Sequence, residues 1–152
     1  MTRERGLDLA GTLLRLVVGG VLLVAGALKV TNLGQSALAV RAYQLLPYDL
    51  AGYVGYALPV IEIIVGLLLV LGLFTRPAAI GGSLLMLAFV VGIASAWARG
   101  LSIDCGCFGG GGQIGVEQTA YPWELTRDAA LVLAGAWLVR RPRTAYALDG
   151  RV

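Results

Sequence analysis

Long apolar stretches constrain this fold more than any other feature of the sequence. A helix that crosses a membrane needs about 20 mostly apolar residues, and four stretches approach that length, at about residues 12–30, 50–74, 77–98 and 123–140. Of the 152 residues, 58% are hydrophobic and 14% are charged, whereas an average soluble domain is roughly half apolar and a quarter charged. We therefore predict an all-α membrane protein, a four-transmembrane-helix bundle formed as a single domain by residues 1–152.

The connecting segments are short and have distinct compositions. Between the first two stretches lies SALAVRAYQLLPYDL (residues 36–50), which is too polar and too short to span a membrane. We predict a short interfacial helix there that ends before Pro47, because proline disfavours helical backbone in the residue preceding it. Tyr43 and Tyr48 would then lie at the level of the lipid headgroups. The glycine-rich run at residues 109–115 is expected to form a flexible linker.

The distribution of lysine and arginine predicts the orientation of the chain. Positively charged residues concentrate on the cytoplasmic side of membrane proteins. One side would hold Arg3, Arg5, Arg76, Arg140, Arg141, Arg143 and Arg151, and the other Lys29, Arg41, Arg99 and Arg127. We therefore expect an integral protein of the cell membrane with both termini in the cytoplasm, and an extracytoplasmic outer loop at residues 99–122.

That loop contains both cysteines of the chain, Cys105 and Cys107, within the stretch SIDCGCFGGGG. Disulfides persist in extracytoplasmic compartments. They join Cα atoms about 4.4–6.8 Å apart, and Gly106 permits the sharp turn that this distance requires. Closing so short a ring adds little stability, and a strained disulfide is easier to reduce. The spacing therefore favours a redox pair over a structural crosslink.

Two other uses of the cysteines stay open at this stage. They could be structural, in a non-catalytic membrane scaffold or maturation subunit, or they could bind Cu(I) or zinc as thiolates. With no histidine and only two methionines, the chain is not expected to complete a metal site alone. The negative charge of Asp104 disfavours a thiolate at Cys105, and Arg99 would offset that charge. The sequence does not decide which cysteine attacks.

Two charged residues within the predicted spans form a second candidate site. Lys29 ends the first stretch and Glu62 lies inside the second. Charges at membrane depth usually face the bundle interior and pair with one another. Antiparallel helices bring Lys29 and Glu62 to similar depth, whereas Arg15 lies about 21 Å farther along its helix. We expect a Lys29–Glu62 ion pair that either locks the two helices or forms a proton or quinone site beside the thiols, with Glu62 handling protons.

Four features stand in order along about half of the chain: Lys29, YQLLP (residues 43–47), LPVIEIIVG (residues 58–66) and RGLSIDCGCFG (residues 99–109). With them the chain resembles the MauE (methylamine utilisation) branch of the DoxX-like integral membrane proteins. The resemblance implies a four-helix membrane protein in extracytoplasmic thiol–disulfide chemistry. MauE proteins are associated with maturation of the disulfide-rich small subunit of methylamine dehydrogenase beside a thioredoxin-like partner, and DoxX relatives with quinone-coupled sulfur oxidation. The resemblance implies that Cys105 and Cys107 are the redox pair. It also makes Lys29 and Glu62 positions that match the family pattern, with no defined role.

The combined prediction is a membrane thiol–disulfide redox protein, hence a candidate thiol–disulfide oxidoreductase. It would exchange electrons with an extracytoplasmic thioredoxin-like or disulfide-containing partner, with a quinone as the expected borrowed cofactor. No cysteine lies within the spans or on the cytoplasmic side, so oxidation of the partner is the favoured direction. The net charge of +3 is spread over chain ends and loops, and no nucleic-acid partner is expected.

Overall fold

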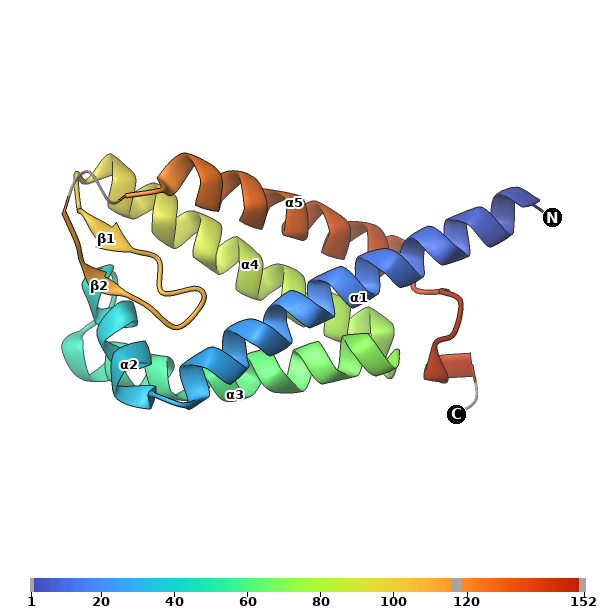
Figure 1. Ribbon diagram of the computed structural model, residues 1–152, viewed down its shortest axis with the longest axis horizontal. Helices are drawn as coiled ribbons and strands as arrows, with labels where there is room; N and C mark the ends of the chain where they lie inside the picture. Colours follow the sequence, from blue (N-terminus) through green and yellow to red (C-terminus); the bar gives the residue numbers. More distant parts are fainter. Residues whose placement is uncertain (1, 116–118, 151–152) are drawn as a thin grey trace.

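The computed structural model describes residues 2–115 and 119–150, which form five α-helices and one small sheet (Figure 1). The helices are α1 (Thr2–Val30), α2 (Leu33–Ala42), α3 (Tyr48–Leu71), α4 (Thr75–Ala98) and α5 (Tyr121–Arg140). The strands β1 (Ile103–Asp104) and β2 (Gly112–Gln113) pair antiparallel, and a 3-10 turn lies at Leu148–Gly150. The described chain is thus mainly helical, with a hairpin of two short strands that the sequence patterns did not predict.

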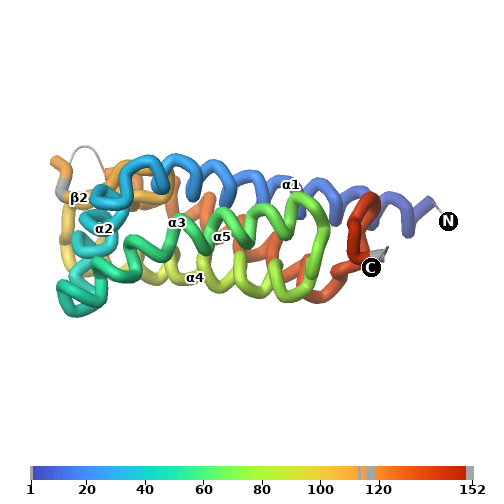
Figure 2. The backbone as a smooth tube through the Cα atoms, turned by 90° about the horizontal axis from the view of Figure 1, so that it is seen from below, coloured from blue at the N-terminus to red at the C-terminus, as the bar shows by residue number. Residues whose placement is uncertain are grey.

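The four long helices α1, α3, α4 and α5 lie lengthwise beside one another, and α2 with the β1–β2 hairpin covers one end of them (Figures 1 and 2). α1 packs mainly on α3, and α4 on α5. Leu22, Leu69 and Leu138 are fully buried between the helices, whereas Leu13 and Leu133 project from the outer surface. Apolar side chains on the outside of a bundle indicate contact with lipid.

Three of these helices, α1, α3 and α4, are long and apolar enough to cross a membrane. α5 has 20 residues, but Glu124, Arg127 and Asp128 make its first turns too polar to meet the same measure. The structure therefore supports an all-α membrane protein with three candidate spans among the described residues.

A proline and a glycine in α3 determine where α2 docks. Pro59 lies inside α3 and has no backbone N–H, so the carbonyl of Gly55, four residues earlier, loses its helical partner. The Ser36 hydroxyl of α2 donates to that carbonyl at 2.6 Å. A Cβ on Gly55 would lie only 2.8 Å from the backbone nitrogen of Ala37. The two backbones therefore meet directly, and the hydroxyl replaces the missing helical hydrogen bond.

The bounds of α2 differ from the expectation for residues 36–50. α2 begins at Leu33, because the Asn32 side chain caps it by accepting a hydrogen bond from the Gln35 N–H at 3.1 Å. It ends at Ala42, and Gln44 then adopts a positive φ of 53°. Proline only disfavours helical backbone in the residue before it. It therefore sets a limit on the length of the helix, and the helix can end earlier.

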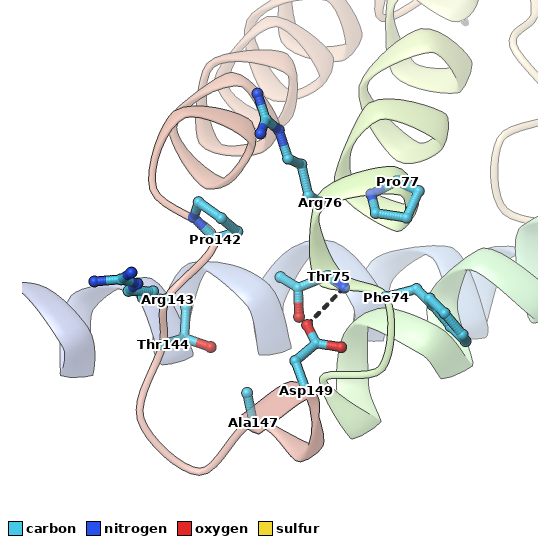
Figure 3. Close-up of a pocket in the computed structure, with 9 residues that line it drawn as sticks. All are labelled: Phe74, Thr75, Arg76, Pro77, Pro142, Arg143, Thr144, Ala147 and Asp149. Atoms are coloured by element: carbon cyan, nitrogen blue, oxygen red, sulfur yellow. Dashed lines mark hydrogen bonds between the residues drawn. The ribbon is translucent and has the colours of Figure 1, made fainter. Parts of the chain in front are cut away.

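The segment that follows α5 crosses the end of the bundle opposite the cysteines (Figure 3). Asp149 accepts a hydrogen bond from the Thr75 N–H at 2.8 Å, and its own N–H donates to the Gly72 carbonyl at 2.9 Å. The buried Arg15 of α1 donates to Thr144 Oγ1 at 2.9 Å. A pocket of about 590 Å³ lies between this segment and the start of α4. The segment therefore ties α1 to the α3–α4 turn.

Candidate functional site

Cys105 and Cys107 form a disulfide directly after β1. Their Cα atoms lie 5.3 Å apart, and their side chains are buried, with 6% and 5% exposed. Gly106 between them has a φ of 70°, a conformation that glycine adopts without steric cost. The Cys107 N–H donates to the Cys105 sulfur at 3.1 Å. A sharp turn at glycine thus brings the neighbouring cysteines within bonding reach.

The glycine run after the cysteines packs closely against α2. A Cβ on Gly111 would overlap with the side chain of Ala39, and one on Gly106 would lie 2.6 Å from the same methyl group. Gly111 also has a φ of 127°, which disfavours any other residue. The Gln35 side-chain amide donates to the Gly111 carbonyl at 2.7 Å. The run is therefore a close backbone contact between the loop and α2, which composition alone does not reveal.

Asp104 organises the same loop through backbone donors. Its Oδ1 accepts from the Gly106 N–H at 3.4 Å, and its Oδ2 accepts from the Gly111 N–H at 3.1 Å. Arg99, the cation expected to offset the charge of Asp104, donates instead to the carbonyls of Tyr43 and Gln44. The hydrogen bonds to the Asp104 carboxylate therefore come from the loop itself.

Tyrosine hydroxyls hold the strand that leads to the disulfide. The Tyr43 hydroxyl donates to the Cys105 carbonyl at 2.8 Å. The Tyr121 hydroxyl accepts from the Ile103 N–H at 3.0 Å and donates to the Leu101 carbonyl. Tyr43 is buried against the cysteine loop, because the docking of α2 turns its ring inward; its depth at the lipid headgroups stays a prediction. Burial raises the pKa of the Tyr43 phenol above its ordinary value, so the hydroxyl remains a donor.

Replacing Tyr43 with phenylalanine is expected to lower the free energy of unfolding by about 1–3 kcal/mol, because the Cys105 carbonyl loses a buried hydrogen bond. Thermal unfolding in detergent micelles measures the change. The matched control is Tyr53→Phe. The Tyr53 side chain is 72% exposed, so loss of its hydroxyl group should leave stability unchanged. Equal stability of Tyr43→Phe and Tyr53→Phe would contradict the role given to the Tyr43 hydroxyl.

Two buried carboxylates on α5, Glu124 and Asp128, lie at the cysteine end of the bundle. Among the described residues, the metal-ligating atoms of Asp104, Cys105 and Glu124 lie within 4.8 Å of one another. Within the described part of the chain, Glu124 Oε2 and Asp128 Oδ2 have no hydrogen-bond partner, while Asp128 Oδ1 accepts from Arg127 Nε at 2.9 Å. Sequence reasoning missed both acids, although two carboxylates at the start of a predicted span were an available signal. Cys105 could act with Asp104 and Glu124 on a metal ion only after the disulfide is reduced, because the thiolate is the ligand.

The predicted ion pair between Lys29 and Glu62 is present. Lys29 Nζ lies 2.7 Å from Glu62 Oε1, and the two side chains are 3% and 0% exposed. Lys29 also lies 5.0 Å from the ring centre of Phe89 and interacts electrostatically with Arg127 and Asp128. Glu62 Oε2 has no hydrogen-bond partner in the described structure. The ion pair is therefore coupled through charge to Arg127 and Asp128 of α5.

A family model described as methylamine utilisation protein MauE matches residues 7–141. The match begins in α1, ends directly after α5 and includes the cysteine loop, so it confirms the MauE identification made from the sequence motifs. Searches among curated proteins and among solved structures found no match. On a match of this length, the chain belongs to the MauE family.

Proposed function

We propose that this MauE family member is a membrane thiol–disulfide redox protein that oxidises an extracytoplasmic thioredoxin-like partner. The observation that carries the proposal is the Cys105–Cys107 disulfide, held in a close-packed loop at one end of an apolar bundle. The partner's two thiols would become a disulfide, while Cys105 and Cys107 take up two electrons and two protons as a dithiol. The family description names methylamine utilisation, and a maturing disulfide-rich protein would be a suitable client there.

The proposed topology has four spans, with α5 as the fourth and α2 lying at the outer interface. α5 lies along α4 (Figure 1). The charges near its start are paired or buried, since Arg127 pairs with Asp128 at 2.9 Å and Glu124 is buried. The bias of arginine toward the end with both termini supports a cytoplasmic location for that end. The disulfide would then lie on the extracytoplasmic side, where such bonds persist.

An apolar groove supports a quinone as the proposed electron acceptor. The groove has a volume of about 270 Å³ and lies beside Tyr43, whose hydroxyl holds the Cys105 carbonyl. Its lining includes Val40, Leu46, Val54, Phe89 and Gly92, which suits an apolar ring entering from the lipid. A bound quinone would supply the two-electron acceptor that restores the disulfide. The residues of this chain would contribute an apolar seat beside the cysteine loop.

One observation favours a second candidate function. Both cysteine side chains are at least nine-tenths buried, which suits a structural disulfide in a non-catalytic scaffold or maturation subunit. The two functions differ in what the cysteines do in cells. A redox pair alternates between oxidised and reduced forms, whereas a structural disulfide stays oxidised.

The test is acid-quenched thiol trapping in intact cells, with a maleimide mass tag applied before and after reduction. We expect a mixture of oxidised and reduced protein in the native chain, and a reducible covalent adduct with another protein in a single-cysteine variant, Cys105→Ser or Cys107→Ser. The Cys105→Ser/Cys107→Ser double variant is the control and should give no adduct. A fully oxidised native chain without any adduct would establish the structural role. Copper or zinc bound to the reduced protein would establish metal binding instead.

A further inference from the structure

The Glu124 carboxylate stands next to the disulfide with one oxygen unused. Its side chain is 8% exposed, and Oε2 has no hydrogen-bond partner among the described residues. A carboxylate oxygen of Glu124 and the Cys105 sulfur lie no more than 4.8 Å apart. A buried polar atom without a partner costs free energy, and reactive sites are where proteins tolerate that cost. Packing therefore does not explain why an unpaired carboxylate oxygen of Glu124 is buried beside the disulfide.

Asp104 is the other acid near the Cys105 sulfur, and its carboxylate already accepts hydrogen bonds. Both of its oxygens accept backbone N–H groups of the loop, from Gly106 and Gly111. Glu124 lies on the first turn of α5, opposite that loop, and the backbone of Cys105 interacts with its carboxylate. A carboxyl group with a free oxygen this close to a sulfur can reach it by a side-chain rotation or through one water. Of the two acids, Glu124 is the one available for proton transfer.

The two sulfur atoms have different surroundings. The Cys105 sulfur accepts a hydrogen bond from the Cys107 N–H at 3.1 Å, and a donor in this position stabilises a thiolate. Cys107 is followed by Phe108, whose ring is 40% exposed and lies 4.8 Å from the Arg127 guanidinium. The part of the loop that reaches the surface therefore lies on the Cys107 side. The two cysteines are almost equally buried, with 6% and 5% exposed, so the neighbours of each sulfur decide the assignment: Cys105 is the leaving group that a donor stabilises, and Cys107 adjoins the exposed Phe108.

We propose that Glu124 gives a proton to Cys105, and takes it back, during thiol–disulfide exchange in which the partner attacks Cys107. This inference rests on the proposed redox function. The partner's thiolate forms a bond with the Cys107 sulfur, the Cys105–Cys107 bond breaks, and its electron pair remains on Cys105. Cys105 then takes the proton of the Glu124 carboxyl group. The partner's second thiolate displaces Cys107, which takes its proton from water, and the partner is left with a disulfide.

The first test measures reduction of the disulfide by dithiothreitol in the purified full-length chain in lipid nanodiscs, from acidic to alkaline pH. Acid-quenched samples with a maleimide mass tag give the rate constant. Glu124→Gln is expected to be slower by about 100-fold, as for loss of a general acid, and to approach the native rate at alkaline pH, where the native carboxyl has lost its proton. The charged or titratable groups around Glu124 are Asp104 on β1, Tyr43 after α2, and Arg127 and Asp128 on α5, and all remain in this variant.

The matched control is Asp128→Asn, which removes a buried acid one turn farther along α5 and should leave the rate close to that of the native chain. Equal rates for Glu124→Gln and the native chain, or equal slowing by Asp128→Asn, would overturn the proposal. The second test uses glutathione with the native chain, so it is independent of how a variant folds. Mass spectrometry should find the mixed disulfide on Cys107 with Cys105 free, and an adduct confined to Cys105 would overturn the assignment.

These tests separate this inference from the redox function on which it rests. If Glu124→Gln slows reduction in nanodiscs but the native chain does not cycle in cells, the proposed cellular redox function is refuted and the role of Glu124 as a proton donor is retained. Cycling in cells without a Glu124 effect would remove the proton donor alone.

Discussion

Replacing Lys29 with methionine is expected to lower the free energy of unfolding by about 3–5 kcal/mol, the usual cost of breaking a buried ion pair from one side. Lys29 Nζ is the hydrogen-bond partner of Glu62 Oε1 at 2.7 Å, and Glu62 Oε2 has no hydrogen-bond partner among the described residues. The variant therefore leaves a fully buried carboxylate uncompensated between α1 and α3. Equilibrium unfolding in mixed detergent micelles measures the loss.

The double variant Lys29→Met/Glu62→Leu is the informative control, because an apolar pair of similar size often matches a buried ion pair in stability. If the pair only locks the helices, the double variant should regain stability and keep the native rate of disulfide exchange. If Glu62 handles protons, the double variant should regain stability but exchange its disulfide more slowly than the native chain. Native stability in the single Lys29→Met variant would contradict the importance given to the ion pair.

Replacing Gly55 with alanine is also expected to lower the free energy of unfolding, by about 1–3 kcal/mol, because the helix contact becomes overpacked. The new Cβ would lie 2.8 Å from the Ala37 nitrogen and 2.9 Å from the Ser36 carbonyl oxygen. Both atoms belong to the backbone of α2, which cannot rotate away as a side chain can. α2 would have to shift, and its Ala39 would lose contact with the glycines of the cysteine loop. We therefore also expect faster reduction of the disulfide by dithiothreitol.

Gly20→Ala provides the control for that prediction. Gly20 lies within α1, and a Cβ at this position would meet no atom within 4 Å apart from its chain neighbours and the adjacent backbone of α1. Alanine should therefore be neutral or stabilising by up to about 1 kcal/mol. Thermal unfolding of the two variants side by side separates a steric clash from a general effect of helix propensity. Matching stability in Gly55→Ala and Gly20→Ala would mean that α2 does not dock on α3 as described.

The sequence was sufficient to predict features that depend on composition or on spacing along one helix. The long helices follow from their apolar residues, and the Lys29–Glu62 pair follows from depth in antiparallel helices. The place of Tyr43 could not be predicted, because it depends on where α2 ends and docks. The glycine run was expected to be a linker because its composition says nothing about Ala39, which lies far away in sequence.

α5 shows a second limit of reasoning from composition. Its mean hydropathy is lowered by Glu124, Arg127 and Asp128, so it falls outside the measure that identifies the other three candidate spans. A hydropathy average counts each charged residue as if its side chain faced the lipid. In the folded chain Asp128 is 2% exposed and pairs with Arg127. Pairing and burial inside the bundle are properties of the fold, and a single segment does not encode them.

The length of α1 has a consequence for how the chain sits in a bilayer. Its 29 residues correspond to about 43 Å of helix, whereas the hydrocarbon layer is about 30 Å thick. The excess lies at the N-terminal end, where α1 extends past the other helices (Figure 1) and Glu4 and Asp8 contact Arg141 at 2.7 and 3.6 Å. In the proposed topology, this charged layer at one end and the polar loop at the other would resist displacement along the membrane normal. The disulfide would then keep a constant height relative to the lipid surface.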